Sequence, residues 1–300
     1  MKWRARAVIA VVSLGVLVSA AGGIYPLAVF NGLVPKDGGS RGVARDVAYA
    51  SGERAHLRRA LDVYAPVKFA GNAPVIVFFY GGSWDSGRRQ DYSFAGRALA
   101  AQGFVVVVPD YRLLPEVGFP AFLQDCADAV RWTRRNAARY GGDGERIVLA
   151  GHSAGAYNAA MLALDPQWLG EDRQAVRGFA ALAGPADFLP LDDPATIAAF
   201  GQWPRLDETQ PVHFASADDP PALLLHGSDD TRVKPRNSRR LAAALEQAGV
   251  SAQLVEYPGL GHVGILTALA KPFRAKAPVL TDLAVFTRRV TEPAAKPDAE

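Results

Sequence analysis

Apolar residues recur along this chain in short runs that alternate with longer amphipathic stretches. Runs such as Val75–Tyr80 and Val105–Pro109 are continuous, as is typical of strands buried on both faces of a sheet. Helical stretches at Phe122–Tyr140, Ala154–Leu164 and Asn237–Ala248 separate the runs. This alternation predicts an α/β fold, with a mostly parallel eight-stranded sheet and helices on both faces. The predicted strands are Val43–Tyr49, Arg58–Tyr64, Val75–Tyr80, Val105–Pro109, Ile147–Ala150, Phe179–Ala183, Ala222–Leu225 and Ala252–Tyr257.

One connection, from Gly184 to Asp219, is long and has no strong hydrophobic period. Connections of this length in a compact domain are usually functional or disordered. Its proline and aromatic residues, among them Phe188, Phe200 and Trp203, argue against disorder. We expect a small cap over the active site; a passive surface excursion is the alternative.

The N-terminus has the pattern of a targeting segment. Lys2, Arg4 and Arg6 precede a stretch from Ala7 to Pro35 that contains no charged residue and is long enough to span a bilayer. Val18-Ser19-Ala20 resembles a signal cleavage site, so a cleaved signal is the alternative to a membrane anchor. The basic residues favour a catalytic domain outside the cytoplasm, either anchored by this segment or secreted or periplasmic after cleavage.

These patterns divide the chain into three parts. Residues 1–35 form the predicted anchor or signal segment, and residues 36–290 form the folded domain. Asp37-Gly-Gly-Ser40 has the composition of a flexible linker between them. Residues 291–300 lack an apolar pattern and are predicted to be a disordered tail.

Composition narrows the possible functions. The net charge is only +3 over 300 residues with no dense Lys/Arg block, so we expect no nucleic-acid partner. The single cysteine, Cys126, excludes an intramolecular disulfide and a cysteine-based metal cluster.

A serine nucleophile is predicted at the junction between an apolar strand and a small-residue helix, in Gly151-His-Ser153-Ala-Gly155. A serine on such a tight turn is crowded by the residues two before and two after it, which explains the two glycines. The turn also directs the N–H of Ala154 toward a developing oxyanion. By itself the five-residue pattern is weak evidence for a nucleophile, but its setting between a strand and a helix strengthens the prediction.

The base is predicted from chain order, because in this arrangement the acid and then the histidine follow the serine. His56 and His152 precede the serine or lie within its turn, and His213 has no strand end to place it. His226 comes immediately before the candidate acids. His262 follows the last predicted strand in a glycine-rich loop, and is the predicted base.

Strand position leaves the acid open. Asp229 and Asp230 both follow the apolar strand at Ala222–Leu225, and Asp187 follows the preceding strand. Any of the three meets the requirement for a group that orients the imidazole.

A second source of oxyanion donors is predicted after the strand Val75–Tyr80. Gly81, Gly82 and Ser83 follow it, and successive glycines let backbone N–H groups approach a substrate closely. A plain tight turn is the alternative.

Together these motifs resemble the esterase/lipase branch of the α/β-hydrolases, which includes carboxylesterases, hormone-sensitive-lipase-like enzymes, kynurenine formamidases and feruloyl-esterase-like proteins. The resemblance covers roughly residues 43–290. The family's His-Gly-Gly-x-Trp motif corresponds to Tyr80-Gly-Gly-Ser-Trp84, and its Pro-Asp-Tyr-Arg-Leu segment to Pro109–Leu113. Its Gly-x-x-Asp-x-x-Val pattern maps onto Gly227–Val233 and selects Asp230, and its Gly-His maps onto Gly261-His262. Tyr80 stands where the family has histidine, which implies different hydrogen bonding around the loop.

The resemblance implies a serine hydrolase of small-molecule carboxylic esters that uses Ser153, Asp230 and His262, with no cofactor or metal. Gly81, Gly82, Ser83 and Ala154 are the implied oxyanion-hole residues, and Tyr80, Trp84 and Tyr157 are expected to line the substrate pocket. A formamidase or peptidase with the same triad is an alternative, and a non-catalytic binding module of this fold is another.

Overall fold

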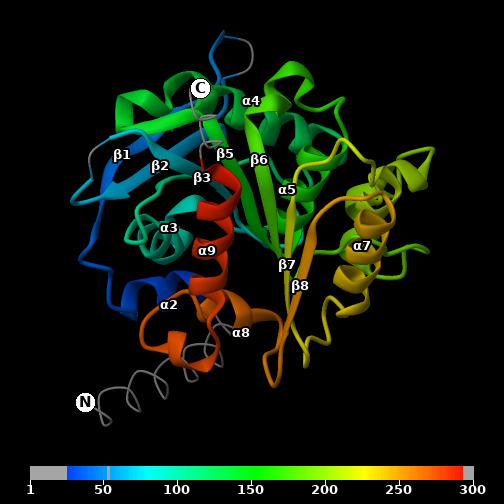
Figure 1. Ribbon diagram of the computed structural model, residues 1–300. Coiled ribbons are helices and arrows are strands. Elements are labelled where there is room, and N and C mark those ends of the chain that lie inside the picture. Colours follow the sequence, from blue (N-terminus) through cyan, green and yellow to red (C-terminus); the bar gives the residue numbers. More distant parts are fainter. Residues whose placement is uncertain (1–25, 53–54, 70, 293–300) are drawn as a thin grey trace, which may run out of the picture.

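The sheet at the centre of the computed structural model confirms the predicted α/β fold (Figure 1), within the described residues 26–52, 55–69 and 71–292. Its eight strands are ordered β1-β2-β4-β3-β5-β6-β7-β8. Strand β2 is antiparallel to both of its neighbours, β1 and β4, and every neighbouring pair from β4 to β8 is parallel. The strands are β1 Ser40–Ala48, β2 Ala60–Pro66, β3 Ala73–Phe79, β4 Val105–Pro109, β5 Gly142–His152, β6 Val176–Leu182, β7 Ala222–Gly227 and β8 Ala252–Tyr257.

Helices cover both faces of the sheet because the central strands are apolar on both sides. All five residues of β4 are buried, as expected for a strand enclosed between helices. On one face α3 (Ser93–Ala100) packs against α9 (Val279–Thr291), and on the other α4 (Ala121–Asn136) packs against α5 (Ala154–Leu164) (Figure 1). The predicted helix at residues 122–140 is therefore α4 followed by a 3-10 turn at residues 137–140.

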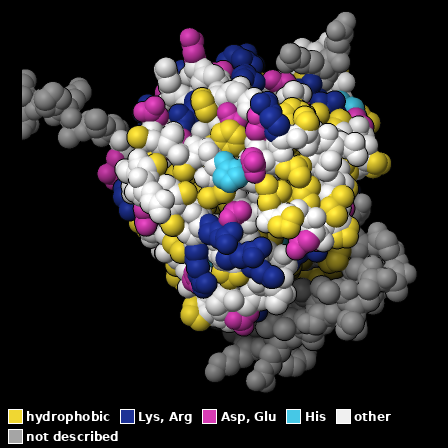
Figure 2. Space-filling view, turned by 90° about the vertical axis from the view of Figure 1, so that its right-hand side faces the viewer, with side chains coloured by type: hydrophobic (Ala, Val, Ile, Leu, Met, Phe, Trp, Pro, Cys, Tyr) yellow, Lys and Arg dark blue, Asp and Glu magenta, His cyan; other side chains and the backbone are white. Residues whose placement is uncertain are grey.

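Helix α7 (Arg236–Gln247) lies along β7 and β8 at one edge of the molecule. Figure 2 shows the corresponding face, where basic side chains gather in a small group among hydrophobic and acidic ones. Exposed arginines of α7 pair with carboxylates: Arg239 Nε lies 2.6 Å from Glu256 Oε1, and a terminal nitrogen of Arg240 lies 2.5 Å from Asp187 Oδ2. Neighbouring acidic groups thus partly neutralise the basic charge of this helix.

The folded domain begins earlier than predicted. Helix α2 (Pro26–Leu33), inside the predicted membrane segment, packs on the domain through Phe30, whose ring centroid is 5.0 Å from that of Phe94. Asp37, in the predicted flexible linker, is buried and pairs with Lys271 and Arg274, and Ser40 begins β1. The boundary near residue 35 and the linker were therefore wrong, because apolar and ionic contacts fix this part of the chain to the domain.

Within the described part of the chain, no helix is long and apolar enough to cross a membrane. Residues 1–25, which carry the rest of the predicted anchor or signal, lie outside the described residues, as do 293–300 of the predicted tail. The first tail residue, Thr291, instead closes α9, where its hydroxyl donates to the Thr287 carbonyl.

The long connection between β6 and β7 forms the predicted small cap. It contains α6 (Pro194–Phe200) and two 3-10 turns at residues 206–209 and 211–214. Asp193 caps α6 by accepting hydrogen bonds from the N–H groups of Ala195 and Thr196. Phe200, fully buried, anchors α6 against the ring of Trp84, with their centroids 4.9 Å apart.

Candidate active site

Ser153 sits in a strained turn between β5 and α5. Its φ of 56° and ψ of −123° are unusual for a residue with a side chain. A Cβ atom on Gly155 would lie 2.1 Å from the Phe79 carbonyl oxygen of the neighbouring strand β3. One on Gly151 would lie 2.3 Å from the Gly155 carbonyl oxygen. Only glycine fits at either position, which is the physical basis of the motif.

Three predicted residues meet at this turn. The Ser153 hydroxyl oxygen is 2.9 Å from Nε2 of His262, the first residue of α8 (His262–Thr267). The other ring nitrogen of His262, Nδ1, donates to Oδ2 of Asp230 over 2.7 Å. Serine, histidine and aspartate therefore form one continuous hydrogen-bonded chain.

The structure separates the three candidate acids. Only Asp230 reaches His262. Asp229, one residue earlier, accepts a hydrogen bond from the Ser228 hydroxyl at 2.6 Å. Asp187 pairs with Arg240 on α7.

Asp230 is held as a carboxylate although it is buried. Burial raises the pKa of its carboxyl, but hydrogen bonds from His226 and His262 outweigh that effect and leave the pKa below its ordinary value. Its Oδ1 atom accepts from the N–H groups of Arg232 and Val233, each at 2.9 Å. The carboxylate is thus fixed in orientation as well as in charge.

Two buried histidines support the hydrogen-bonded chain from Ser153 to Asp230. The sequence analysis rejected both as bases and did not predict this supporting role. His226, at the end of β7, lies 2.7 Å from the Val233 carbonyl oxygen through Nε2, so that nitrogen carries a proton. The same nitrogen lies 3.3 Å from Oδ2 of Asp230. In the sequence, the position of His226 at a predicted strand end, directly before the candidate acids, was the feature that could have indicated this role.

The second histidine, His152, packs against His262 with ring centroids 4.8 Å apart. Its Nε2 donates to the His262 carbonyl oxygen over 2.9 Å. Burial and the neighbouring His262 lower the pKa of His152 to about 3, so this imidazole stays neutral. It therefore holds the backbone of the base without adding charge.

The glycine loop after β3 is held by tyrosine hydroxyls. Tyr111 donates to the Tyr80 carbonyl oxygen at 2.8 Å, and Tyr92 donates to the Gly81 carbonyl oxygen at 3.1 Å. Gly82 has a φ of 134°, and a Cβ atom there would lie 2.3 Å from the Ser86 carbonyl oxygen. With both carbonyls fixed, the loop backbone is held in one conformation beside Ser153.

An ion cluster around the buried Arg89 anchors the segment that follows this loop. Arg89 contacts Asp46 and Asp110 with its terminal nitrogens, and Nε donates to Asp62 over 3.0 Å. The backbone N–H of Arg89 also donates to Asp110 over 2.6 Å. Asp110 immediately follows β4, so the cluster ties the loop to the sheet.

Of the three aromatic residues expected to line the pocket, only Trp84 does so. Tyr80 and Tyr157 are fully buried, and that prediction was wrong for both. The Tyr80 ring stacks on Tyr111 beneath the glycine loop, with centroids 4.7 Å apart. The Tyr157 ring packs behind Trp84 and Phe200. Both side chains point into the core because the adjoining strand and helix direct them there.

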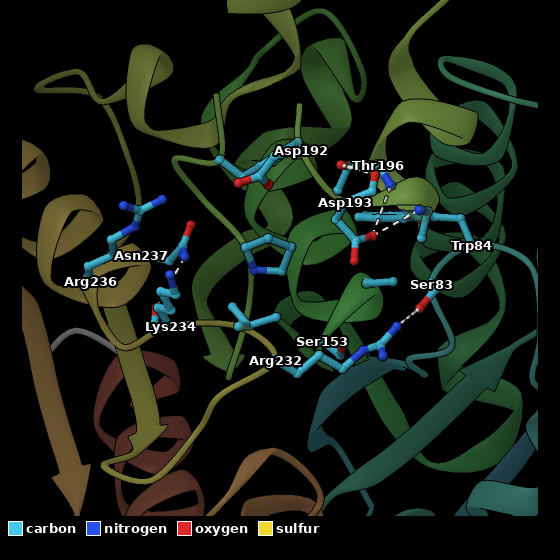
Figure 3. A pocket seen from close by; sticks show the side chains of 15 residues that line it. Ser83, Trp84, Ser153, Asp192, Asp193, Thr196, Arg232, Lys234, Arg236 and Asn237 are labelled. Atoms are coloured by element: carbon cyan, nitrogen blue, oxygen red, sulfur yellow. Dashed lines mark hydrogen bonds between the residues drawn. The ribbon is translucent and has the colours of Figure 1, made fainter. Parts of the chain in front are cut away.

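Two cavities meet at Ser153. One, of about 130 Å³, lies under the cap (Figure 3) and is lined by Trp84, Phe188, Thr196 and Asn237, among others. The other, of about 480 Å³, lies between α2 and α8 and includes His262 in its wall. Arg232 borders both, and its guanidinium donates to the Ser83 hydroxyl oxygen over 2.7 Å (Figure 3).

No group of three or more His, Cys, Asp or Glu residues in the described ranges is arranged to hold a metal ion. The groups that the site brings together are a nucleophile, a base, a carboxylate and backbone dipoles.

Comparison with known proteins agrees with this geometry. The BD-FAE family model matches residues 61–245. A carboxylesterase of Mycobacterium tuberculosis is 33% identical over 239 residues, which are 72% of this chain and 74% of that protein. A probable isoprenylcysteine alpha-carbonyl methylesterase of Arabidopsis thaliana is 29% identical over 80% of this chain and 61% of that protein. The chain spans about three fifths of the length of such plant relatives.

Solved structures show the same fold at lower identity. A truncated carbohydrate esterase from gut microbiota superposes with a TM-score of 0.74 at 23% identity, covering 86% of this chain and 99% of that one. An inhibited esterase B of Lactobacillus rhamnosis gives a TM-score of 0.76 at 21% identity, covering 95% of this chain and 96% of that one.

Proposed function

We propose that this chain, which belongs to the BD-FAE family of α/β-hydrolases, is a serine hydrolase that cleaves carboxylic esters through an acyl-enzyme. The observation that carries the proposal is the continuous hydrogen-bonded chain from Ser153 through His262 to Asp230. Relatives named carboxylesterase and methylesterase favour an ester over other acyl substrates.

Acylation begins at the Ser153 hydroxyl. As its oxygen bonds to the ester carbonyl carbon, its proton passes to Nε2 of His262, which lies 2.9 Å away. Asp230 keeps the Nδ1 proton in place and stabilises the imidazolium that forms. The C–O bond to the alcohol then breaks, and His262 gives its proton to the departing oxygen.

The negative charge of the tetrahedral intermediate falls on the former carbonyl oxygen. We assign its donors to the backbone N–H groups of Gly82, Ser83 and Ala154, with Gly81 supplying the close turn. The first N–H groups of α5 have no acceptor within their helix, which leaves that of Ala154 free for this role. Deacylation repeats the sequence, with water activated by His262 in place of serine.

Hydrolysis of p-nitrophenyl acetate tests the proposal. Purified wild-type protein is expected to release p-nitrophenol, and Ser153→Ala and His262→Ala each to lower kcat by several orders of magnitude. Normal turnover by a folded Ser153→Ala protein would overturn it.

Two alternatives use the same fold. A formamidase or peptidase would prefer formylkynurenine or a peptide over a feruloyl or simple alkyl ester in a substrate panel. A non-catalytic binding module would hydrolyse none of them. The filled triad argues against the binding module, because loss of any one member would disable the chemistry.

We also propose that the N-terminal segment places the catalytic domain outside the cytoplasm, anchored or released. The uncharged stretch that precedes α2, from Ala7 to Tyr25, together with the basic residues before it, supports this. N-terminal sequencing of the mature protein distinguishes an anchor from a cleaved signal, and recovery of the intact protein in the soluble cytoplasmic fraction would contradict both.

A further inference from the structure

We infer that this enzyme acts on esters that join a short acyl group to an apolar alcohol, and that helix α2 supplies the wall that selects the alcohol. The inference rests on the proposed function and assigns the two cavities at Ser153 to the two halves of the ester.

The position of His262 sets the direction of the substrate. In acylation His262 must give a proton to the alcohol oxygen, so the alcohol departs on the side of its imidazole. His262 forms part of the wall of the cavity between α2 and α8 and is absent from the lining of the cavity under the cap. The cavity between α2 and α8 therefore takes the alcohol, and the cavity under the cap takes the acyl group.

The acyl cavity is small, and its lining combines aromatic rings with charged side chains such as Asp192, Asp193 and Lys234. Its volume of about 130 Å³ is the space of roughly four water molecules. Trp84, Phe188 and Thr196 of α6 are among the residues that line it. Trp84 is 3% exposed and held by Phe200, so the wall does not yield easily to a longer chain. An acetyl or similarly short group fits this space.

The alcohol cavity is larger and mainly apolar. Its volume is about 480 Å³, and α2 contributes Leu27 and Phe30 to one side while α8 contributes Val263 and Leu266 to the other. Val263, directly after the proposed base, is 57% exposed. An apolar alcohol lying between these helices would cover that exposed surface, which favours its burial.

The charged groups that line this cavity are already engaged. Both carboxylate oxygens of Asp91 accept from Nε of Arg88, at 3.1 and 3.0 Å, and Asp91 is buried. Arg232 is hydrogen-bonded to Ser83 at the border between the two cavities. Arg88 thus neutralises the charge of Asp91, and the charge of Arg232 lies where the two cavities meet.

Helix α2 is a fixed wall, because polar contacts join it to the segment after the glycine loop. The Asn31 amide oxygen accepts from the Ser93 hydroxyl at 2.8 Å and from the Phe94 N–H at 3.0 Å, at the start of α3. Its amide nitrogen donates to the Gln90 carbonyl over 3.0 Å. Leu27 thus has a defined position relative to Ser153.

The test compares isomeric esters on the full-length protein. Hexyl acetate and ethyl hexanoate have the same atoms, and differ in which side of the ester carries the long chain. Burying one methylene can raise kcat/KM by up to about fourfold. We expect hexyl acetate to exceed ethyl acetate by at least about tenfold in kcat/KM, and to exceed ethyl hexanoate by a similar factor.

Variants of α2 test the wall. Leu27→Gln replaces the leucine with a polar side chain that is one atom longer and of similar volume, and is expected to lower the ratio of hexyl acetate to ethyl acetate by at least about threefold. Leu27→Trp, which narrows the cavity, is expected to lower the same ratio. The matched control is Leu33→Gln on the same helix, since Leu33 is 42% exposed and outside both cavities; its ratio should equal that of the wild type.

The possible failures are distinguishable. A protein that hydrolyses p-nitrophenyl acetate but prefers ethyl hexanoate, or shows no dependence on alcohol length, overturns the inference and leaves the proposed function standing. Equal effects of the Leu27 and Leu33 variants overturn the role of α2. Failure to hydrolyse any ester overturns both.

Discussion

Replacing Asp230 by asparagine changes one atom in the hydrogen-bonded chain and should remove most of the activity. In the wild type, one carboxylate oxygen accepts from the N–H groups of Arg232 and Val233 and the other from His262. An asparagine keeps the two backbone contacts only if its carbonyl oxygen faces them. Its NH₂ group then faces His262, whose Nδ1 must become an acceptor and whose proton must move to Nε2.

A proton on Nε2 faces the Ser153 hydroxyl and prevents His262 from acting as its base. The wrong tautomer is expected to lower kcat by about 10³ to 10⁴, equivalent to about 4 to 5.5 kcal/mol of lost transition-state stabilisation. KM should change little, because Asp230 lines neither cavity beside Ser153.

The assay is steady-state hydrolysis of p-nitrophenyl acetate, with circular dichroism to confirm folding. Asp229→Asn and Asp187→Asn are matched controls, since one carboxylate precedes Asp230 directly and the other follows the neighbouring strand. Both should keep nearly full activity. Activity of Asp230→Asn within tenfold of wild type, or loss of activity in either control, would refute the reasoning.

Other predictions concern stability. Gly155→Ala would place a Cβ atom 2.1 Å from the Phe79 carbonyl oxygen, and is expected to cost about 1 to 3 kcal/mol or more and to lower Tm by several degrees. Gly32→Ala, with open space around it, is the control, and an equal loss in both would contradict the steric account. Burial raises the pKa of Asp37, but Arg274 and Lys271 outweigh it and hold the pKa below its ordinary value. Its contribution is present above the unfolded pKa of about 3.9 and is lost as pH falls through the lower folded pKa. Asp37→Asn should therefore lower the free energy of unfolding measured in urea at pH 7, and its difference from the wild type should shrink progressively as pH falls below about 4. A pH-independent difference would count against the ion pairs.

Chain order and local pattern were sufficient for most of the fold and for Ser153 and His262. The strand–turn–helix setting of Ser153 is local, and a predicted strand end placed two of the three candidate aspartates, Asp229 and Asp230, after β7. The choice of Asp230 over Asp229 came from the family resemblance, because two adjacent aspartates at a strand end differ only in the direction in which their side chains point. The structure supplies that direction through two backbone N–H groups.

Long-range packing could not be predicted in the same way. Tyr80 adjoins the glycine loop in sequence, yet its ring lies beneath the loop against Tyr111, far along the chain. The apolar residues of α2 have the pattern of a membrane segment, and only their contact with Phe94 and Phe273 shows that they belong to the domain. His226 supports the acid through distances that no local motif encodes.

The central claim is that Ser153 is the nucleophile of an acyl transfer, and labelling with a fluorophosphonate probe tests it most directly. The account predicts one covalent adduct per chain, located on Ser153 by peptide mass spectrometry and absent from Ser153→Ala and from heat-denatured protein. An unlabelled wild-type protein, or an adduct on another residue, would contradict it.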